Sequence, residues 1–301
     1  MDNSVVIVQD LVKRYASFAA VDGLSFSVAA GEVFGLLGPN GAGKTTTLEC
    51  LEGIRNADGG RLSVAGCDPQ SQTGQLRDLL GVQLQSSSLP DSIEVREALT
   101  LFSAWHGEPF REDLAEKFAV VPLYHKQFKQ LSAGQKRRLQ LVLALVNHPQ
   151  VVVLDEPTAG LDVQSRASLH EEIRALKQQG ITVLLATHDM AEAEALCDRI
   201  AILIHGRLAV CGTPQEVTAA GNRETRIQLH TARGSLLPGQ NIGEALFVGT
   251  REGYLEWKAR DVAAAVMQIL GKVQTAGDTV EDLRVERPTL EERFLELVEG
   301  N

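Results

Sequence analysis

A glycine-rich segment, residues 38–45, most constrains what this chain can fold into. It fits the pattern G-x-x-x-x-G-K-[S/T] and lies between the apolar stretch Val33–Leu37 and a helix expected at 45–52. Glycines let successive backbone N–H groups turn inward around an anion, and the following helix directs its positive end there. Lys44 can then reach the β- and γ-phosphates of a nucleotide, and the Thr45 hydroxyl can bind Mg²⁺. The segment therefore predicts a nucleotide-phosphate site at the end of a strand.

Apolar stretches of strand length alternate with helical patterns further along the chain, at 151–154, 181–186 and 200–204. This alternation predicts an α/β fold with a mostly parallel sheet, and continuous apolar strands are typical of a sheet covered on both faces. Residues 86–135 lack strand alternation and predict a helical subdomain. This segment is apolar at Leu89, Pro90, Val95, Leu99 and Phe102, which is compatible with a surface for contact with another protein or simply with the core of the subdomain.

Beyond Pro214 the pattern changes to short strands and helices, which predicts a nucleotide-binding domain at 1–220 and a small α+β domain at 221–301. The strands of the small domain are expected at 226–230, 254–258 and 282–285, with a helix at 261–271. A second helix should begin at Thr289, because Glu292 three residues later completes a capping-box pattern.

Charge and apolar length exclude several classes of function. The net charge of −10 argues against a protein that holds nucleic acid on a broad basic surface. The longest apolar runs fall well short of the about 20 residues that span a membrane, and the N-terminus lacks the pattern of a signal peptide. We expect a cytoplasmic protein. Neither a zinc site nor disulfides are expected, because no C-x-x-C pair occurs among Cys50, Cys67, Cys197 and Cys211.

Asp155 and Glu156 follow the apolar strand expected at 151–154. Alone, the pair would be compatible with solvated acids at a strand end. Downstream of a phosphate-binding loop it suits metal-dependent phosphoryl transfer, with Asp155 in the Mg²⁺ shell and Glu156 accepting a proton from the attacking water.

Two more positions suit phosphate chemistry. Residues 131–135, Leu-Ser-Ala-Gly-Gln, open a helix and form a second potential anion site, although Ser132 alone is an ordinary N-cap. One nucleotide does not need two such sites on one chain, so this one would serve a nucleotide held by a second copy. His188 follows the strand expected at 181–186, where ligands of open α/β sheets bind, although a lone histidine is more often structural.

Together these segments resemble the ABC ATPase family, in the family's order and across roughly residues 4–220. The resemblance implies a P-loop NTPase core with a mixed sheet and a helical subdomain. The resemblance identifies residues 38–45 as the Walker A loop, Gln85 as the Q-loop glutamine and 131–135 as the LSGGQ signature. It identifies 155–156 as Walker B with the catalytic glutamate, 159–162 as the D-loop and His188 as the switch histidine. Two departures are Ala133 in the signature and a second glutamine, Gln83, near Gln85.

The resemblance also implies individual roles. Nucleotide contacts are implied for Tyr15, which falls where the family stacks a ring on adenine, and for Gly38, Pro39, Asn40, Gly41, Ala42, Gly43, Lys44, Thr45, Thr46, Ser132, Gly134 and Gln135. The implied Mg²⁺ ligands are Thr45, Gln85 and Asp155. The implied catalytic residues are Glu156, His188 and Gln85.

Residues 288–297, Pro-Thr-Leu-Glu-Glu-Arg-Phe-Leu-Glu-Leu, look like the C-terminal end of daunorubicin-exporter-like ATPases, a group of bacterial drug and polysaccharide exporters. This implies a Mg²⁺-dependent ATPase coupled to transport, peripheral on the inner face of the plasma membrane. The implied partners are a separate multi-span permease chain and, head to tail, an identical or related ATPase subunit; no nucleic acid is expected.

The alternative is a soluble ABC ATPase that acts on the ribosome or on DNA. Translation-type members usually carry two such domains, and repair members insert a long coiled coil for which the stretch between Lys44 and Ser132 is too short. A metabolic P-loop kinase would not need the 132–135 segment together with His188.

Overall fold

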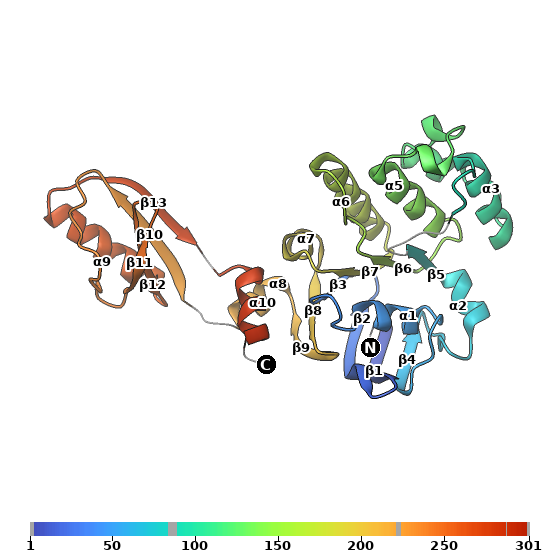
Figure 1. Ribbon diagram of the computed structural model, residues 1–301, viewed down its shortest axis with the longest axis horizontal. Coiled ribbons are helices and arrows are strands. Elements are labelled where there is room, and N and C mark those ends of the chain that lie inside the picture. The colour runs from blue at the N-terminus through green and yellow to red at the C-terminus, as the bar shows by residue number, and fades with distance from the viewer. Residues whose placement is uncertain (1–2, 84–88, 221–223, 287, 300–301) are drawn as a thin grey trace. The chain divides into compact units, whose positions relative to one another are not determined.

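The computed structural model describes residues 3–83, 89–220, 224–286 and 288–299, and the chain divides into two compact units between Pro214 and Gln215 (Figure 1). The division falls at the start of helix α8 (Pro214–Ala219), somewhat earlier than the boundary at residue 220 expected from the sequence. Each unit has its own hydrophobic core and is described by itself.

A six-stranded sheet of order β5-β6-β7-β3-β8-β9 forms the centre of the first unit. In that order its strands are Leu80–Gln83, Val151–Asp155, Thr182–Thr187, Val33–Leu37, Arg199–Ile204 and Arg207–Gly212. All neighbours pair in parallel except β9, which is antiparallel to β8. Every residue of β3 and β6 is buried, as expected for the apolar residues of these strands, and the burial includes Asp155 at the end of β6. The predicted, mostly parallel α/β sheet is confirmed.

A second, antiparallel sheet of order β2-β1-β4 joins strands Phe18–Ala29, Ser4–Tyr15 and Gly59–Val64. It shares a core with the central sheet, in which the rings of Phe26 and Phe34 stack with their centres 5.2 Å apart. Helices of the same unit are α1 (Lys44–Leu51), α2 (Thr73–Leu79), α6 (Val163–Gln178) and α7 (Met190–Leu196).

The described residues between 89 and 144 fold into helices rather than strands, as expected. These are α3 (Val95–His106), α4 (Glu112–Lys117), the 3-10 turns η1 (Val121–Leu123) and η2 (Phe128–Gln130), and α5 (Ala133–Ala144). Val95 and Leu99 are fully buried, so they belong to the core and not to a contact surface. The exposed large apolar side chains of α3 are instead Leu101 and Trp105.

The second unit contains a four-stranded antiparallel sheet of order β11-β12-β10-β13. Its strands are Leu246–Arg251, Tyr254–Ala259, Thr225–Thr231 and Val280–Glu286. Helix α9 (Val262–Thr275) packs against it through a core that includes the fully buried Trp257 (Figure 1).

The last helix, α10 (Leu290–Glu299), follows Thr289 as predicted. The Glu292 N–H donates to Thr289 Oγ1 at 3.2 Å, and the Thr289 N–H donates to Glu292 Oε2 at 3.1 Å, so the capping box is confirmed. Among the described residues, no helix of either unit is both long and apolar enough to cross a bilayer.

Gly81 allows helix α5 to pack directly on strand β5, because a Cβ at this position would overlap the backbone oxygen of Ala144. We expect Gly81→Ala to destabilise the first unit by about 1–3 kcal/mol through overpacking. Urea-induced unfolding followed by circular dichroism measures this change. The matched control is Gly74→Ala in α2, where a Cβ meets nothing within 4 Å. Equal unfolding midpoints for the two variants would contradict the packing argument.

Candidate nucleotide-binding site

A cavity opens beside the glycine-rich loop that follows β3. The loop and the first turn of α1 line one side of it, with Pro39, Asn40, Gly41, Gly43, Lys44, Thr45 and Thr46. Tyr15 at the end of β1 and Phe18 at the start of β2 line another part, and Glu156 reaches it from the end of β6. The structure thus brings phosphate-loop, aromatic and carboxylate residues to one place.

The loop depends on glycine at two positions with left-handed backbone. Gly41 has φ 82° and Gly43 has φ 100°. A Cβ on Gly43 would lie 2.5 Å from the backbone oxygen of Ala20, so a side chain would collide with β2. Gly43 is also the N-cap of α1, which places the unpaired N–H groups of that helix at the cavity.

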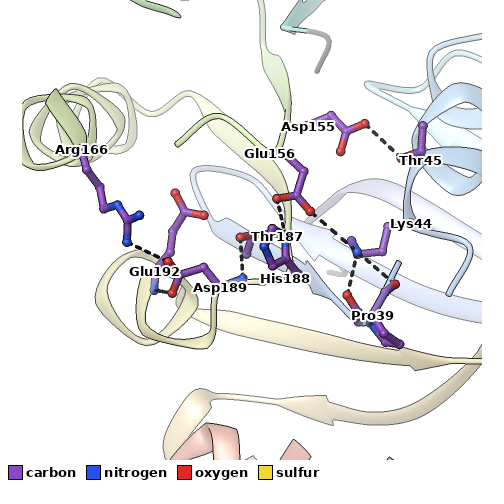
Figure 2. A network of polar contacts seen from close by, with 11 residues as sticks. Pro39, Lys44, Thr45, Asp155, Glu156, Arg166, Thr187, His188, Asp189 and Glu192 are labelled. Carbon is purple, nitrogen blue, oxygen red and sulfur yellow. Dashed lines mark hydrogen bonds and ion pairs between the residues drawn. The ribbon is translucent and has the colours of Figure 1, made fainter. Parts of the chain in front are cut away.

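Lys44 is buried and turned back over its own loop (Figure 2). Its ammonium donates to the backbone oxygens of Gly38 at 2.6 Å and Pro39 at 3.3 Å, and it lies 3.8 Å from Glu156 Oε1. Burial lowers the pKa of Lys44, while the carboxylates of Glu156 and Asp155 oppose that change. Phosphate oxygens are better partners for this ammonium than neutral backbone oxygens.

Asp155 ends β6 with a carboxylate directed at the first turn of α1 (Figure 2). Its Oδ2 accepts a hydrogen bond from the Thr45 hydroxyl at 3.1 Å. Its Oδ1 is buried and has no hydrogen-bond partner among the described residues. Burial raises the pKa of Asp155, and the Thr45 hydrogen bond opposes that rise. A buried carboxylate oxygen without a partner beside a hydroxyl is a suitable ligand pair for a hard cation.

Glu156 follows Asp155, and its carboxylate lies between the His188 ring and the Lys44 ammonium in Figure 2. Its Oε2 is 2.7 Å from Nδ1 of His188, and its Oε1 faces Lys44. Its φ of 50° is left-handed, which is strained for a non-glycine residue. The Glu156 N–H donates to the backbone oxygen of Ala186 at 2.9 Å, which holds this conformation against β7.

Residues beside His188 fix the segment that carries it (Figure 2). The Asp189 N–H donates to Thr187 Oγ1 at 3.0 Å, and Asp189 Oδ1 accepts from the Glu192 N–H at 3.1 Å as the N-cap of α7. Asp189 Oδ2 also pairs with Arg166 of α6 at 2.9 Å. The sequence did not indicate the ion pair with Arg166. The N-cap role of Asp189 could have been predicted, because aspartate directly before a helix is a common N-cap.

Ser132 is the N-cap of α5 within a reciprocal capping box: its Oγ accepts from the Gln135 N–H at 3.2 Å, and Gln135 Oε1 accepts from the Ser132 N–H at 3.1 Å. Ala133 is exposed, so its methyl group is accommodated. A Cβ on Gly134 would lie 2.6 Å from Ser165 Oγ of α6, so close helix packing requires glycine there. In the described structure, Ser132, Gly134 and Gln135 do not line the cavity that contains Lys44.

Of the remaining expected site residues, Gln85 lies outside the described residues. Gln83 is the last residue of β5 and is buried. Ala42 is buried inside the loop. The cavity residues that the sequence did not single out are Phe18 and Ala20 of β2, together with Glu49 and Arg55. Glu49 and Arg55 lie near the C-terminal end of α1 and just after it, where no motif pointed to them.

Comparison with known proteins gives consistent matches. The family model described as ABC transporter matches residues 21–159. The daunorubicin resistance ATP-binding protein DrrA3 of Streptomyces coeruleorubidus is 35% identical and covers 99% of this chain and 96% of its own length. The Nod factor export ATP-binding protein I of Burkholderia orbicola (strain AU 1054) is 44% identical and covers 68% of this chain and 70% of its own length.

Solved structures agree. One described as the ATP-binding subunit of an ABC transporter has a TM-score of 0.66 at 27% identity, covering 72% of this chain and 93% of its own. CbiO1 from Clostridium perfringens, part of an ABC transporter complex, also has a TM-score of 0.66, at 29% identity, with 72% and 91% covered. With the phosphate loop, the two carboxylates and the histidine gathered at one edge of the sheet, these matches establish that the chain belongs to the ABC transporter family, as an ATP-binding and ATP-hydrolysing subunit.

Proposed function

We propose that this subunit powers an exporter: it binds ATP with Mg²⁺, pairs head to tail with a second copy or a related ATPase, and drives a separate permease at the inner face of the plasma membrane. The observation that carries the proposal is that Lys44, Thr45 and Glu156 line one cavity, with Asp155 hydrogen-bonded to Thr45 and His188 paired with Glu156. Export is supported by two relatives named for daunorubicin resistance and Nod factor export.

The Mg²⁺ assignment is supported by the chemistry of Asp155 and Thr45. The unpartnered Oδ1 of Asp155 and the Thr45 hydroxyl supply oxygen ligands, which Mg²⁺ prefers. A cation there would offset the desolvation that raises the pKa of Asp155. When bound, Mg²⁺ neutralises charge on the phosphates. Gln85 is proposed as a further ligand from the family resemblance alone.

In the proposed mechanism, Lys44 exchanges the backbone oxygens of its loop for phosphate oxygens, and the N-terminus of α1 stabilises the same charge. Glu156 orients the attacking water and accepts its proton. His188, 2.7 Å from Glu156, holds that carboxylate and contacts the γ-phosphate. Ribose and base extend toward Tyr15, with Thr46 beside the phosphates.

Head-to-tail pairing is supported by the position of the 132–135 segment. The segment forms a second helix N-terminus, which begins with the sequence Ser-Ala-Gly. In the described structure it does not line the cavity of its own chain. A partner's nucleotide would give its N–H groups an anion. ATP would then stabilise the pair because it binds the closed arrangement best, and loss of the γ-phosphate would release it.

Docking of the permease on helix α3 is supported by two exposed apolar side chains one turn apart, Leu101 at 54% and Trp105 at 64% exposure. The ring of Phe102 packs edge-on against Trp105 with 6.2 Å between ring centres, so the indole has a defined neighbour.

Glu156→Gln should reduce phosphate release by about 10²–10⁴-fold, because the amide cannot accept a proton. The same variant should accumulate as an ATP-bound dimer in light scattering. Glu171→Gln, an exposed glutamate on α6, is the control and should hydrolyse ATP normally. Turnover of the Glu156 variant at the wild-type rate would exclude Glu156 as the base.

Ser132→Asp should abolish ATP hydrolysis while preserving the fold, because aspartate also caps a helix but repels a phosphate. Ser132→Asn caps without charge and should keep most activity. An equal mixture of Ser132→Asp with Lys44→Ala should recover about a quarter of wild-type activity, since exchange creates dimers with one intact composite site. No recovery from subunits shown to exchange would contradict head-to-tail pairing.

Replacing Leu101 and Trp105 by aspartate should weaken capture of the subunit by membranes that contain its permease, by about tenfold or more, because buried aromatic anchors dominate such interfaces. Met267→Asp on α9, where the native side chain is 69% exposed, is the matched control. Undiminished capture would place the docking surface elsewhere.

A further inference from the structure

The cavity beside the phosphate loop also contains an ion pair that no motif accounts for. Arg55 Nε donates to Glu49 Oε2 at 2.6 Å, and both residues line the cavity together with Tyr15. Glu49 projects from α1, whereas Arg55 follows that helix, so the pair ties the segment after the helix to the helix itself. The hydrogen bond that Arg55 donates to Glu49 raises the pKa of Arg55, which keeps the guanidinium charged.

The Arg55 guanidinium also lies over the aromatic ring of Tyr15, with 5.2 Å between Cζ and the ring centre. A planar guanidinium stacks on such a ring and is attracted to its negative face. Insertion of a base between the two planes would require roughly 7 Å, which is twice a van der Waals contact. The guanidinium therefore backs the ring. The Lys13 ammonium, 5.8 Å from the same ring centre, is a second cation beside it, and we expect the base of a nucleotide to stack on the part of the ring that these two cations leave free.

Tyr15 needs such support because of where it is. It is the last residue of β1, it is 40% exposed, and the turn to β2 follows it directly. A half-exposed ring at a strand end samples several rotamers, and fixing one of them costs conformational entropy when a ligand binds. An anchored cation on one face holds the ring before the nucleotide arrives.

Resting on the proposed function, we propose that Arg55, held by Glu49, is a positioning residue for base recognition, which keeps the Tyr15 ring in the orientation that stacks on the base of the nucleotide. The effect is confined to ligands that carry a base, because Arg55 acts through Tyr15 and not on the phosphates.

Calorimetric titration of the purified subunit with two probes, ATP with Mg²⁺ and inorganic tripolyphosphate with Mg²⁺, tests this assignment. Arg55→Ala should raise the Kd for ATP by roughly three- to tenfold and leave kcat unchanged. Its Kd for tripolyphosphate should equal that of the wild type. Arg174→Ala is the matched control, because Arg174 forms an equally short ion pair, with Glu171 at 2.6 Å, on α6.

A double-mutant cycle identifies the route of the effect. If Arg55 acts through Tyr15, Arg55→Ala combined with Tyr15→Ala should bind ATP no more weakly than Tyr15→Ala alone. Additive losses, an equal loss of tripolyphosphate affinity, or an unchanged Kd for ATP in Arg55→Ala would each overturn the proposal. Failure of the proposed function would give a different result from failure of the Arg55 proposal. In that case the wild-type protein would not bind ATP, or Lys44→Ala would bind ATP as tightly as the wild type.

Discussion

Mutual compensation of buried charges at one edge of the central sheet underlies the organisation of the first unit. Lys44, Asp155 and Glu156 are all nearly inaccessible to water, and ions in such surroundings are tolerated only when they are paired and hydrogen-bonded. The parallel order β6-β7-β3 supplies the pairing, because it brings the carboxyl ends of three strands together. In the proposed function, the same charges that the fold must compensate bind a magnesium-bound triphosphate.

Features fixed by local sequence were predictable. The loop after β3 and the acids after β6 each depend on a strand ending in a few residues of defined chemistry, and parallel pairing then brings them together. Strands β5, β9 and β11 were missed because their signals are weak or non-local. Strand β5 follows α2 without a turn, and β11 contains Gly249 and a bulge.

Side-chain contacts between segments that are distant in the chain could not be predicted from the sequence either. The Arg166–Asp189 pair and the approach of Arg55 to Tyr15 join elements whose proximity only the folded chain defines. Apolar residues of α3 illustrate the same limit: the sequence marked Val95 and Leu99 as surface candidates, but the orientation of the helix buries them and exposes Leu101 and Trp105. Helical periodicity indicates that an apolar face exists, not which neighbour covers it.

The close approach of Gly134 to Ser165 has a mechanical consequence. Helices α5 and α6 pack closely there, with Gly134 against the Ser165 side chain, and Arg138 of α5 adds contacts to Ser168 at 3.1 Å and Glu172 at 3.1 Å along α6. Because they are joined along their length, we expect the two helices to move as one rigid body. In the head-to-tail pair proposed above, Ser132 at the start of α5 and Asp162 at the start of α6 would therefore approach the partner subunit together.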